Sequence, residues 1–329
     1  MSALAPIVEA FFTQRLAGQL QASPNTIAAY RDAFRLLLRF VDQHTGKPPS
    51  QLDIADLHAP LIGAFLHHLE HERGDGPRTR NHRLAAIRSL FRYAALHHPE
   101  HAALIQRVLA MPNRRHDHAV VSYLTPDEIH ALVAAPDPTT RIGRRDHALL
   151  LVAVQTGLRV SELAALRRRD IQLGAGAHIR CHGKGRKERT TPLTAQTVTV
   201  LRAWLDELDH APDTPIFPGP RGTPIGRDAI RRRVAKHAAA ARARCPSLHG
   251  KPVTPHVLRH TAAMQLLHAG CDSAVIALWL GHENPRSTQP YIHADLALKE
   301  QALARTTPPE VNPGRYRPPD PLLAFLEGL

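Results

Sequence analysis

Apolar side chains recur at helical spacing through the first hundred residues. The clearest stripe follows a start signal at Ser23 and Pro24, an N-cap residue and a proline at the first helical position. That stripe is Ile27, Tyr30, Phe34, Leu37 and Val41, and two more follow as Leu61, Phe65, Leu66 and Leu69, and as Leu84, Ile87, Leu90 and Phe91. We therefore expect residues 1–110 to form an all-helical unit.

A basic stretch without periodicity occupies residues 111–123, and this break predicts a linker between two domains. A new helix should begin at Thr125, a capping residue followed by Pro126 and two acids. Beyond it the pattern predicts a mostly helical second domain over residues 124–304, with another arginine-rich helix from Arg227 to Arg244. Segments 177–182 and 188–193 flank a Gly-Lys-Gly-Arg turn and predict a hairpin in a small antiparallel sheet. The expected fold class is thus mostly α, with an α+β second domain.

The last segment, residues 305–329, is rich in proline and ends in the apolar run Leu322–Leu329. Its composition predicts an extended spacer with a tail that docks on a protein surface. Two docking sites are open from the sequence: the tail's own domain, or a neighbouring subunit that the spacer allows it to reach.

A formal net charge of +13 indicates a polyanionic partner, and double-stranded DNA is the first expectation. Arginines concentrate on the helix over residues 77–94, which contains no acid, in the hairpin turn, and on the helix after residue 227. We expect DNA contacts from Arg78, Arg80, Arg83, Arg88, Arg186, Arg231 and Arg232. The alternative is an ordinary solvated basic face.

Other classes of protein fit less well. No apolar run approaches the length of a membrane span, and three dispersed cysteines form neither a disulfide framework nor a zinc pattern. The pair His67 and His71 lacks a third ligand, and no P-loop pattern is present. We therefore expect a cytoplasmic, nucleoid-associated protein with no metal, no cofactor and no membrane partner.

Three local contexts indicate phosphate chemistry. Thr254 and Pro255 place His256 and Arg259 in the opening turns of a helix, on one face, where backbone N–H groups also attract anions. Arg159 follows the end of an apolar helix at Gly157, and needs either Glu162 or a phosphate as its partner. Lys184 lies in the Gly-x-Gly turn, from which a lysine can donate a proton to a leaving oxygen, although an exposed turn lysine is the plainer interpretation.

The ordered set resembles the tyrosine recombinase, or phage integrase, family. Residues 156–166 are similar to its first arginine box, residues 255–261 to its second, and residues 183–189 to its catalytic lysine loop. The run Leu280-Gly281-His282 with Tyr291 nine residues later resembles its third box and nucleophile. The likeness covers the chain from the N-terminus to about residue 300, and is strongest to transposon-associated integrases.

The resemblance implies a SAM-like helical core-binding domain and a catalytic domain that form a C-shaped clamp around DNA. It also implies roles: Arg159, Arg259 and His282 bind the scissile phosphate, His256 exchanges a proton or hydrogen bond, Lys184 is the general acid, and Tyr291 attacks to give a 3′-phosphotyrosyl intermediate. Glu162 would orient its neighbours. Such a reaction conserves phosphodiester energy and needs neither ATP nor a metal. Pro290 directly precedes Tyr291 and either fixes or impairs the approach of its hydroxyl.

The expected enzyme is a site-specific recombinase for mobile-element integration or excision. We expect a homo-tetramer on DNA, a dimer of dimers with exchanged C-terminal tails. Two alternatives stay open: a type IB topoisomerase-like enzyme acting as a monomer, and a non-catalytic DNA-binding accessory protein. The sequence does not define the target site, or whether other recombinases take part.

Overall fold

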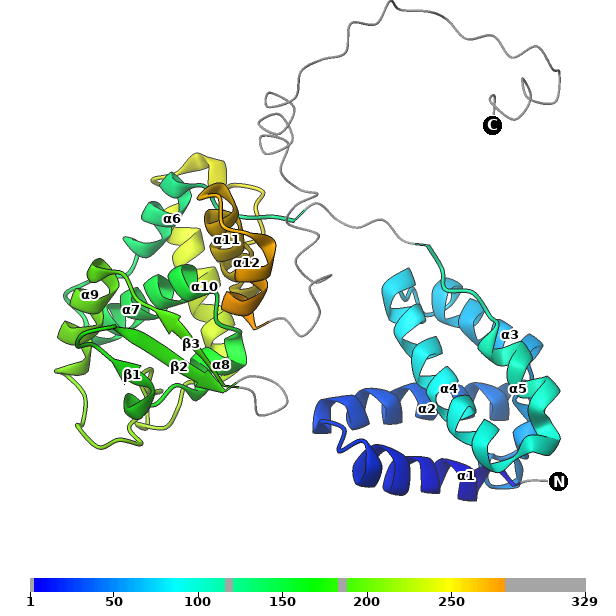
Figure 1. The fold of residues 1–329 in the computed structure, drawn as a ribbon. Helices are drawn as coiled ribbons and strands as arrows, with labels where there is room; N and C mark the ends of the chain where they lie inside the picture. Colours follow the sequence, from blue (N-terminus) through cyan, green and yellow to red (C-terminus); the bar gives the residue numbers. More distant parts are fainter. Residues whose placement is uncertain (1–2, 116–120, 183–187, 282–329) are drawn as a thin grey trace, which may run out of the picture. The chain divides into compact units, whose positions relative to one another are not determined.

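The computed structural model describes residues 3–115, 121–182 and 188–281. It divides the chain into two compact units, Met1–His118 and Ala119–Leu329 (Figure 1). The division lies within the stretch interpreted above as a linker. Each unit has its own hydrophobic core.

The N-terminal unit is helical throughout its described part. Ser23 begins its long second helix as expected, with its side chain accepting a hydrogen bond from the Thr26 amide at 3.2 Å. The helices are α1 (Leu4–Ala10), a π-helical segment (Phe11–Gln19), α2 (Pro24–Thr45), α3 (Ala59–His71), α4 (Pro77–His97) and α5 (Ala102–Leu109). Helix α4 packs against α2, α3 and α5, so that the three predicted stripes meet in one core.

The second unit combines helices with a three-stranded antiparallel sheet in the order β1-β2-β3. The hairpin is confirmed as β2 (His178–His182) and β3 (Glu188–Pro192), and β1 (Ile171–Gln172) adds a short edge strand. The helices are α6 (Pro126–Val133), α7 (Arg141–Thr156), α8 (Val160–Ala165), α9 (Ala195–Leu205), α10 (Arg227–Ala241), α11 (Pro255–His268) and α12 (Ser273–Leu280). The mostly α fold with a small sheet is therefore confirmed.

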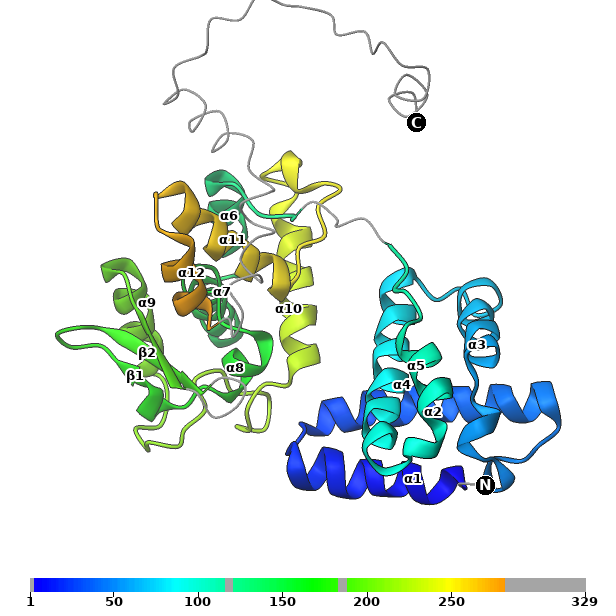
Figure 2. The same cartoon turned by 45° about the vertical axis from the view of Figure 1, so that its right-hand side comes forward.

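Helix α7 is the centre of this unit: it packs against α9 on one side and α11 on the other (Figures 1 and 2). Most of its residues are buried, and it ends at Gly157, whose φ of 63° is left-handed. Helix α12 packs beside α11 and reaches strand β3. This arrangement brings the end of α7, the start of α8, and helices α11 and α12 to one region.

Two buried ionic clusters hold α10 and the approach to α11. Asp146 of α7 is 1% exposed, pairs with Arg145 at 2.7 Å, and lies 2.8 Å from Nε2 of His237 on α10. Glu128 of α6 is fully buried and accepts hydrogen bonds from Ser247 at 2.7 Å and Lys251 at 2.8 Å. Both carboxylates therefore have compensating partners, as a buried charge requires: Asp146 has the adjacent Arg145 and the distant His237, and Glu128 has distant groups only.

Candidate DNA-cleavage site

Helix α11 begins as the sequence predicts. The Thr254 side chain accepts a hydrogen bond from the Val257 amide at 3.2 Å, and Pro255 is the first helical residue. His256 is exposed, whereas Arg259, one turn later, is only 4% exposed. The two side chains reach the same pocket from one helix face, at different depths.

Arg259 bonds to two main-chain carbonyls that belong to other elements. Its Nη1 donates to the Gly157 carbonyl and its Nη2 to the Leu280 carbonyl, both at 2.7 Å. Gly157 closes α7, and Leu280 is the last residue of α12. The second arginine box therefore joins the ends of two helices, and the carbonyl-rich end of a helix favours a cation there.

Arg159 lies just before α8 in an extended conformation. Its Nη1 donates to Oε1 of Glu162 and its Nη2 to the Gly281 carbonyl, both at 3.0 Å. The side chain is 36% exposed, so this guanidinium is accessible at the pocket in addition to these two contacts. Arg159 and Arg259 thus bond to the consecutive carbonyls of Gly281 and Leu280.

Glu162 is shared between Arg159 and a second arginine. Besides the bond from Nη1, the backbone amide of Arg159 donates to Oε2 of Glu162 at 2.7 Å. Arg189 of β3 donates to both of its oxygens, Nη1 to Oε1 at 2.9 Å and Nη2 to Oε2 at 2.7 Å. Burial raises the pKa of Glu162, but the hydrogen bonds and charges of Arg189 and Arg159 outweigh that effect and lower it below its usual value. Glu162 is therefore a carboxylate shared by two guanidiniums. Of the two partners that the sequence left open for Arg159, Glu162 is in contact with it, and the three side chains together leave a surplus of positive charge.

The sequence did not assign a role to Arg189. Its signal is the register of β3, where Arg189 and Thr191 point towards the protein while Glu188 and Thr190 are exposed. A charged residue at an inward position of a strand needs a buried partner of opposite charge. Arg189 is the missed residue of this site.

The His256 ring lies 4.1 Å from the His260 ring, centroid to centroid, in an edge-to-face arrangement. Burial by surrounding protein atoms, and secondly the charge of Arg259, lower the pKa of His256. A histidine with a lowered pKa is neutral at physiological pH and can accept a proton or hydrogen bond. This favours the acceptor role over a cationic one.

Arg159, His256 and Arg259 line one pocket of about 540 Å³, which we call the cationic pocket. Its lining contains three arginines and a histidine, and no carboxylate: Arg159, Val160, Arg231, Ala235, Val253, Thr254, Pro255, His256 and Arg259. Arg231 reaches it from α10 and pairs with Asp228 at 2.7 Å, at the exposed surface. Such a pocket suits a small anion that accepts several hydrogen bonds, such as a phosphodiester.

Four of the expected site residues lie outside the described residues: Lys184, Arg186, His282 and Tyr291. Pro290 and the C-terminal tail do as well. Their neighbours in the chain are placed, since β2 and β3 flank the turn and Gly281 precedes His282.

The arginines expected to contact DNA from α4 have different surroundings. Arg78 is exposed, as is Arg232 of α10 in the other unit. Arg83 pairs with Asp75, which precedes the helix, and its side chain is 18% exposed. Arg80 bonds to the Pro112 carbonyl at 3.3 Å, and Arg88 bonds to Oδ1 of Asn113 at 3.0 Å. These last three arginines hold parts of their own unit together, and their contact with DNA stays a prediction.

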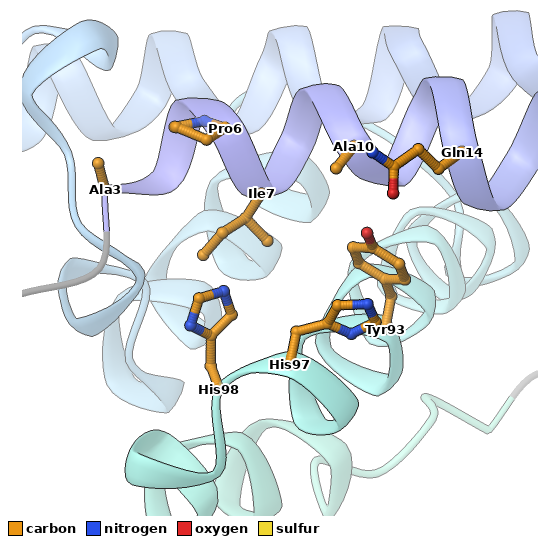
Figure 3. Close-up of a pocket in the computed structure, with 8 residues that line it drawn as sticks. All are labelled: Ala3, Pro6, Ile7, Ala10, Gln14, Tyr93, His97 and His98. Carbon is orange, nitrogen blue, oxygen red and sulfur yellow. The ribbon is translucent and has the colours of Figure 1, made fainter.

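The N-terminal unit has a pocket of about 370 Å³ between α1 and α4, drawn in Figure 3. Tyr93 and His97 lie side by side there, with ring centroids 4.5 Å apart, and His98 lines the same space. No arginine or lysine lines it, in contrast to the cationic pocket. Within the described residues, no group of three or more side chains that could hold a metal ion is present, although the ring centroids of His67 and His71 lie 4.0 Å apart. The same residues include no helix long and apolar enough to span a bilayer.

A fold with these features has known counterparts. Residues 122–297 match the model of the phage integrase family, and residues 10–98 match the phage integrase N-terminal SAM-like domain. The chain is 54% identical over 328 residues to the putative integrase/recombinase y4rC of Sinorhizobium fredii, covering 100% of this chain and 99% of that protein. It is 33% identical to the tyrosine recombinase XerC of Pelobacter propionicus, covering 91% of this chain and 96% of that protein.

Solved structures agree in fold. The XerH site-specific recombinase bound to its difH substrate aligns with a TM-score of 0.70 and 20% identity, over 87% of this chain and 81% of that chain. The Tn1549 transposon integrase in complex with circular intermediate DNA aligns with a TM-score of 0.68 and 15% identity, over 93% of this chain and 100% of that chain. The helical SAM-like domain followed by a catalytic domain is the architecture of tyrosine recombinases. This chain belongs to the phage integrase family.

Proposed function

We propose that this protein, a site-specific DNA recombinase by family, cuts and rejoins double-stranded DNA through a 3′-phosphotyrosyl intermediate. The observation that supports this most is the cationic pocket, where Arg159, Arg259 and His256 come together without a lining carboxylate. Three boxes far apart in the sequence supply the bonds around it, and a phosphodiester is the ligand that matches them.

In the proposed reaction, Arg159 and Arg259 bind the nonbridging oxygens of the scissile phosphate. Their guanidiniums are already fixed by bonds to the carbonyls of Gly157, Leu280 and Gly281. Preorganised donors stabilise the charge that develops on a pentacoordinate phosphorus without reorganising during the reaction. Removal of one such donor typically costs a factor of about 10²–10³ in rate.

We assign the nucleophile to Tyr291. Its phenolic oxygen would attack phosphorus while its proton passes to a neutral acceptor such as His256. The bond from phosphorus to the 5′ oxygen then breaks, and Lys184 protonates that oxygen as it leaves. His282 would donate a further hydrogen bond to the phosphate, and a 5′-hydroxyl of a second strand reverses the steps. Since the phosphotyrosine bond keeps the phosphodiester energy, the cycle consumes no ATP.

The biological setting we propose is integration or excision of a mobile element, by cytoplasmic protein acting on nucleoid DNA. The two units would close around the DNA as a clamp, with exposed Arg78, Arg231 and Arg232 among the phosphate contacts. Arg80, Arg83, Arg88 and Arg186 complete the set of proposed contacts. Four subunits would assemble on two sites and exchange their C-terminal tails.

The test is a suicide substrate, a DNA site nicked beside the cleavage position so that the cut strand diffuses away. We expect a covalent protein–DNA adduct that resists denaturing electrophoresis, forms in the presence of EDTA and disappears in Tyr291→Phe. Tyr30→Phe, the same change in the N-terminal unit, is the matched control and should keep the adduct. Absence of an adduct on a site that the protein verifiably binds contradicts the proposal and leaves a non-catalytic DNA-binding protein.

Assembly separates recombination from a topoisomerase-like activity. A recombinase requires synapsis of two sites, so relaxation of plasmid DNA by dilute monomer would favour the topoisomerase alternative. Truncation after Pro319 should leave DNA binding unchanged and weaken assembly on paired sites, measured by native electrophoresis. Unchanged tetramer formation by the truncated protein would contradict tail exchange.

A further inference from the structure

Arg189 connects the hairpin to the first arginine box and to the third box. It lies in β3, two residues after the turn segment 183–187, and its side chain is only 10% exposed. Its guanidinium grips both oxygens of Glu162, whose side chain is 5% exposed. A paired, parallel set of two hydrogen bonds is the strongest arrangement between these groups.

The charges of Arg159, Glu162 and Arg189 do not cancel. Burial lowers the pKa of Arg189, but its bonds to Glu162 outweigh that effect and raise it, so Arg189 stays protonated. The pKa of Glu162 is lowered overall, so it stays ionised. Two cations and one anion leave one positive charge. Arg159 is 36% exposed against 10% for Arg189, so the surplus lies at the pocket.

Arg189 also packs under the backbone that Arg159 contacts. Gly281 has a φ of 63°, and a Cβ added there would lie 2.8 Å from Nη1 of Arg189 and 3.1 Å from its Cδ. The carbonyl of the same Gly281 accepts the hydrogen bond from Arg159. Arg189 therefore contacts both partners of Arg159, Glu162 through hydrogen bonds and Gly281 through packing.

We propose that Arg189 is a positioning residue for DNA cleavage: by neutralising Glu162 it leaves the charge of Arg159 available to the scissile phosphate. This inference rests on the proposed function. Without Arg189, Glu162 would have Arg159 as its main partner, and the closed pair would carry no net charge. The phosphate would then compete with a buried carboxylate for one guanidinium.

The first experiment compares Arg189→Met, Glu162→Gln and the double variant on the nicked substrate. Arg189→Met should form the adduct at least about tenfold more slowly at neutral pH, because Glu162 then neutralises Arg159 and the phosphate loses the charge of that donor. The double variant should cleave faster than Arg189→Met, because the competing carboxylate is gone. Such non-additivity marks two residues that act through one interaction.

A pH profile gives a signature that a structural role would not produce. Three groups face the carboxylate of Glu162: Arg159 just before α8, Arg189 of β3 and Cys181 of β2. The Cys181 thiol stays neutral, because burial raises its pKa to about 11. In Arg189→Met the pKa of Glu162 loses its largest lowering contribution, so acidification should protonate Glu162 and release Arg159. The rate relative to wild type should therefore rise as the pH falls, and the double variant should lack this rise.

A binding measurement keeps the inference separate from cleavage. In a Tyr291→Phe background, the slope of log affinity against log salt should fall by about one phosphate contact in Arg189→Met and recover in the double variant. If wild type forms no adduct but this slope changes as expected, the proposed function fails and the placement of the Arg159 charge stands.

Arg144→Met is the matched control, since Arg144 also grips both oxygens of a glutamate, Glu207, but at an exposed position of the same unit. It should cleave at the wild-type rate. The inference is overturned if Arg189→Met cleaves and binds like wild type. It is equally overturned if the double variant is as inactive or as unfolded as Arg189→Met, because Arg189 would then serve the fold alone.

Discussion

Gly157→Ala tests how tightly the end of α7 is fitted against the third box. Gly157 has a φ of 63°, and an added Cβ would lie 2.7 Å from Cδ2 of Leu280 and 3.1 Å from Cβ of Ala262. A left-handed conformation costs an alanine about 1–2 kcal/mol. Overpacking of a filled core adds about 1–3 kcal/mol, because Leu280 is fully buried and cannot move aside. The free energy of unfolding should therefore fall by about 2–5 kcal/mol.

Gly270→Ala is the control that separates the two costs. Gly270 also follows a helix of the second unit, has a φ of 82° and has no atom within 4 Å of an added Cβ. The free energy of unfolding of Gly270→Ala should therefore fall only by the conformational cost, about 1–2 kcal/mol.

Urea unfolding followed by tryptophan fluorescence measures both variants, because both tryptophans of the chain, Trp204 and Trp279, lie in the second unit. Trp279 donates to the Thr156 carbonyl at 3.1 Å, next to the substituted residue. Equal losses in Gly157→Ala and Gly270→Ala would refute the packing argument.

Three further changes probe the surroundings of the site. Asp146→Asn should lower the free energy of unfolding by about 3–5 kcal/mol in urea titrations, because it leaves the buried guanidinium of Arg145 without its paired carboxylate. A loss below about 1 kcal/mol would contradict a buried ion pair. The pKa of Glu128 is lowered, because its bonds to groups such as Lys251 outweigh burial, so its stabilising contribution is present above its ordinary value of 4.5 and is lost as the pH falls. The stability difference between wild type and Glu128→Gln should accordingly shrink on acidification, and a constant difference in urea unfolding at successive pH values would argue against this. Thr254→Ala removes the cap of α11 and should lower the free energy of unfolding by about 1 kcal/mol, measured by calorimetry. An unchanged free energy would mean that water replaces the cap, and would contradict this prediction.

The sequence predicted the elements that have local signals. The starts of α2, α6 and α11 follow from Ser23, Thr125 and Thr254, each of which caps its helix in the structure. The hairpin followed from its turn residues. The gathering of Arg159, His256 and Arg259 at one pocket followed from the recognised boxes and not from any local rule.

What the sequence did not provide depends on tertiary contacts. Helix α7 begins at Arg141, earlier than its apolar run indicates, after the cap residue Thr140, which accepts a hydrogen bond from the Gly143 amide at 3.0 Å. The burial of Arg145 and Asp146 as a pair within its first turns depends on tertiary contacts and has no signal in the apolar pattern. Strand β1 has two residues, too few for an alternating pattern. The arginines of α4 looked unpaired, since the acid that Arg83 binds lies outside the helix.

The hydrogen bonds that join the two arginine boxes and the third box have main-chain acceptors. This affects how members of the family can be compared and engineered. The carbonyls of Gly157, Leu280 and Gly281 stay in place when other side chains change, as long as the backbone path is kept. Covariation between aligned side chains would therefore miss this coupling. Single-residue insertions or deletions near residues 157 or 281 would shift the register of the acceptors and uncouple the boxes, so chimeras between relatives should be joined away from both points.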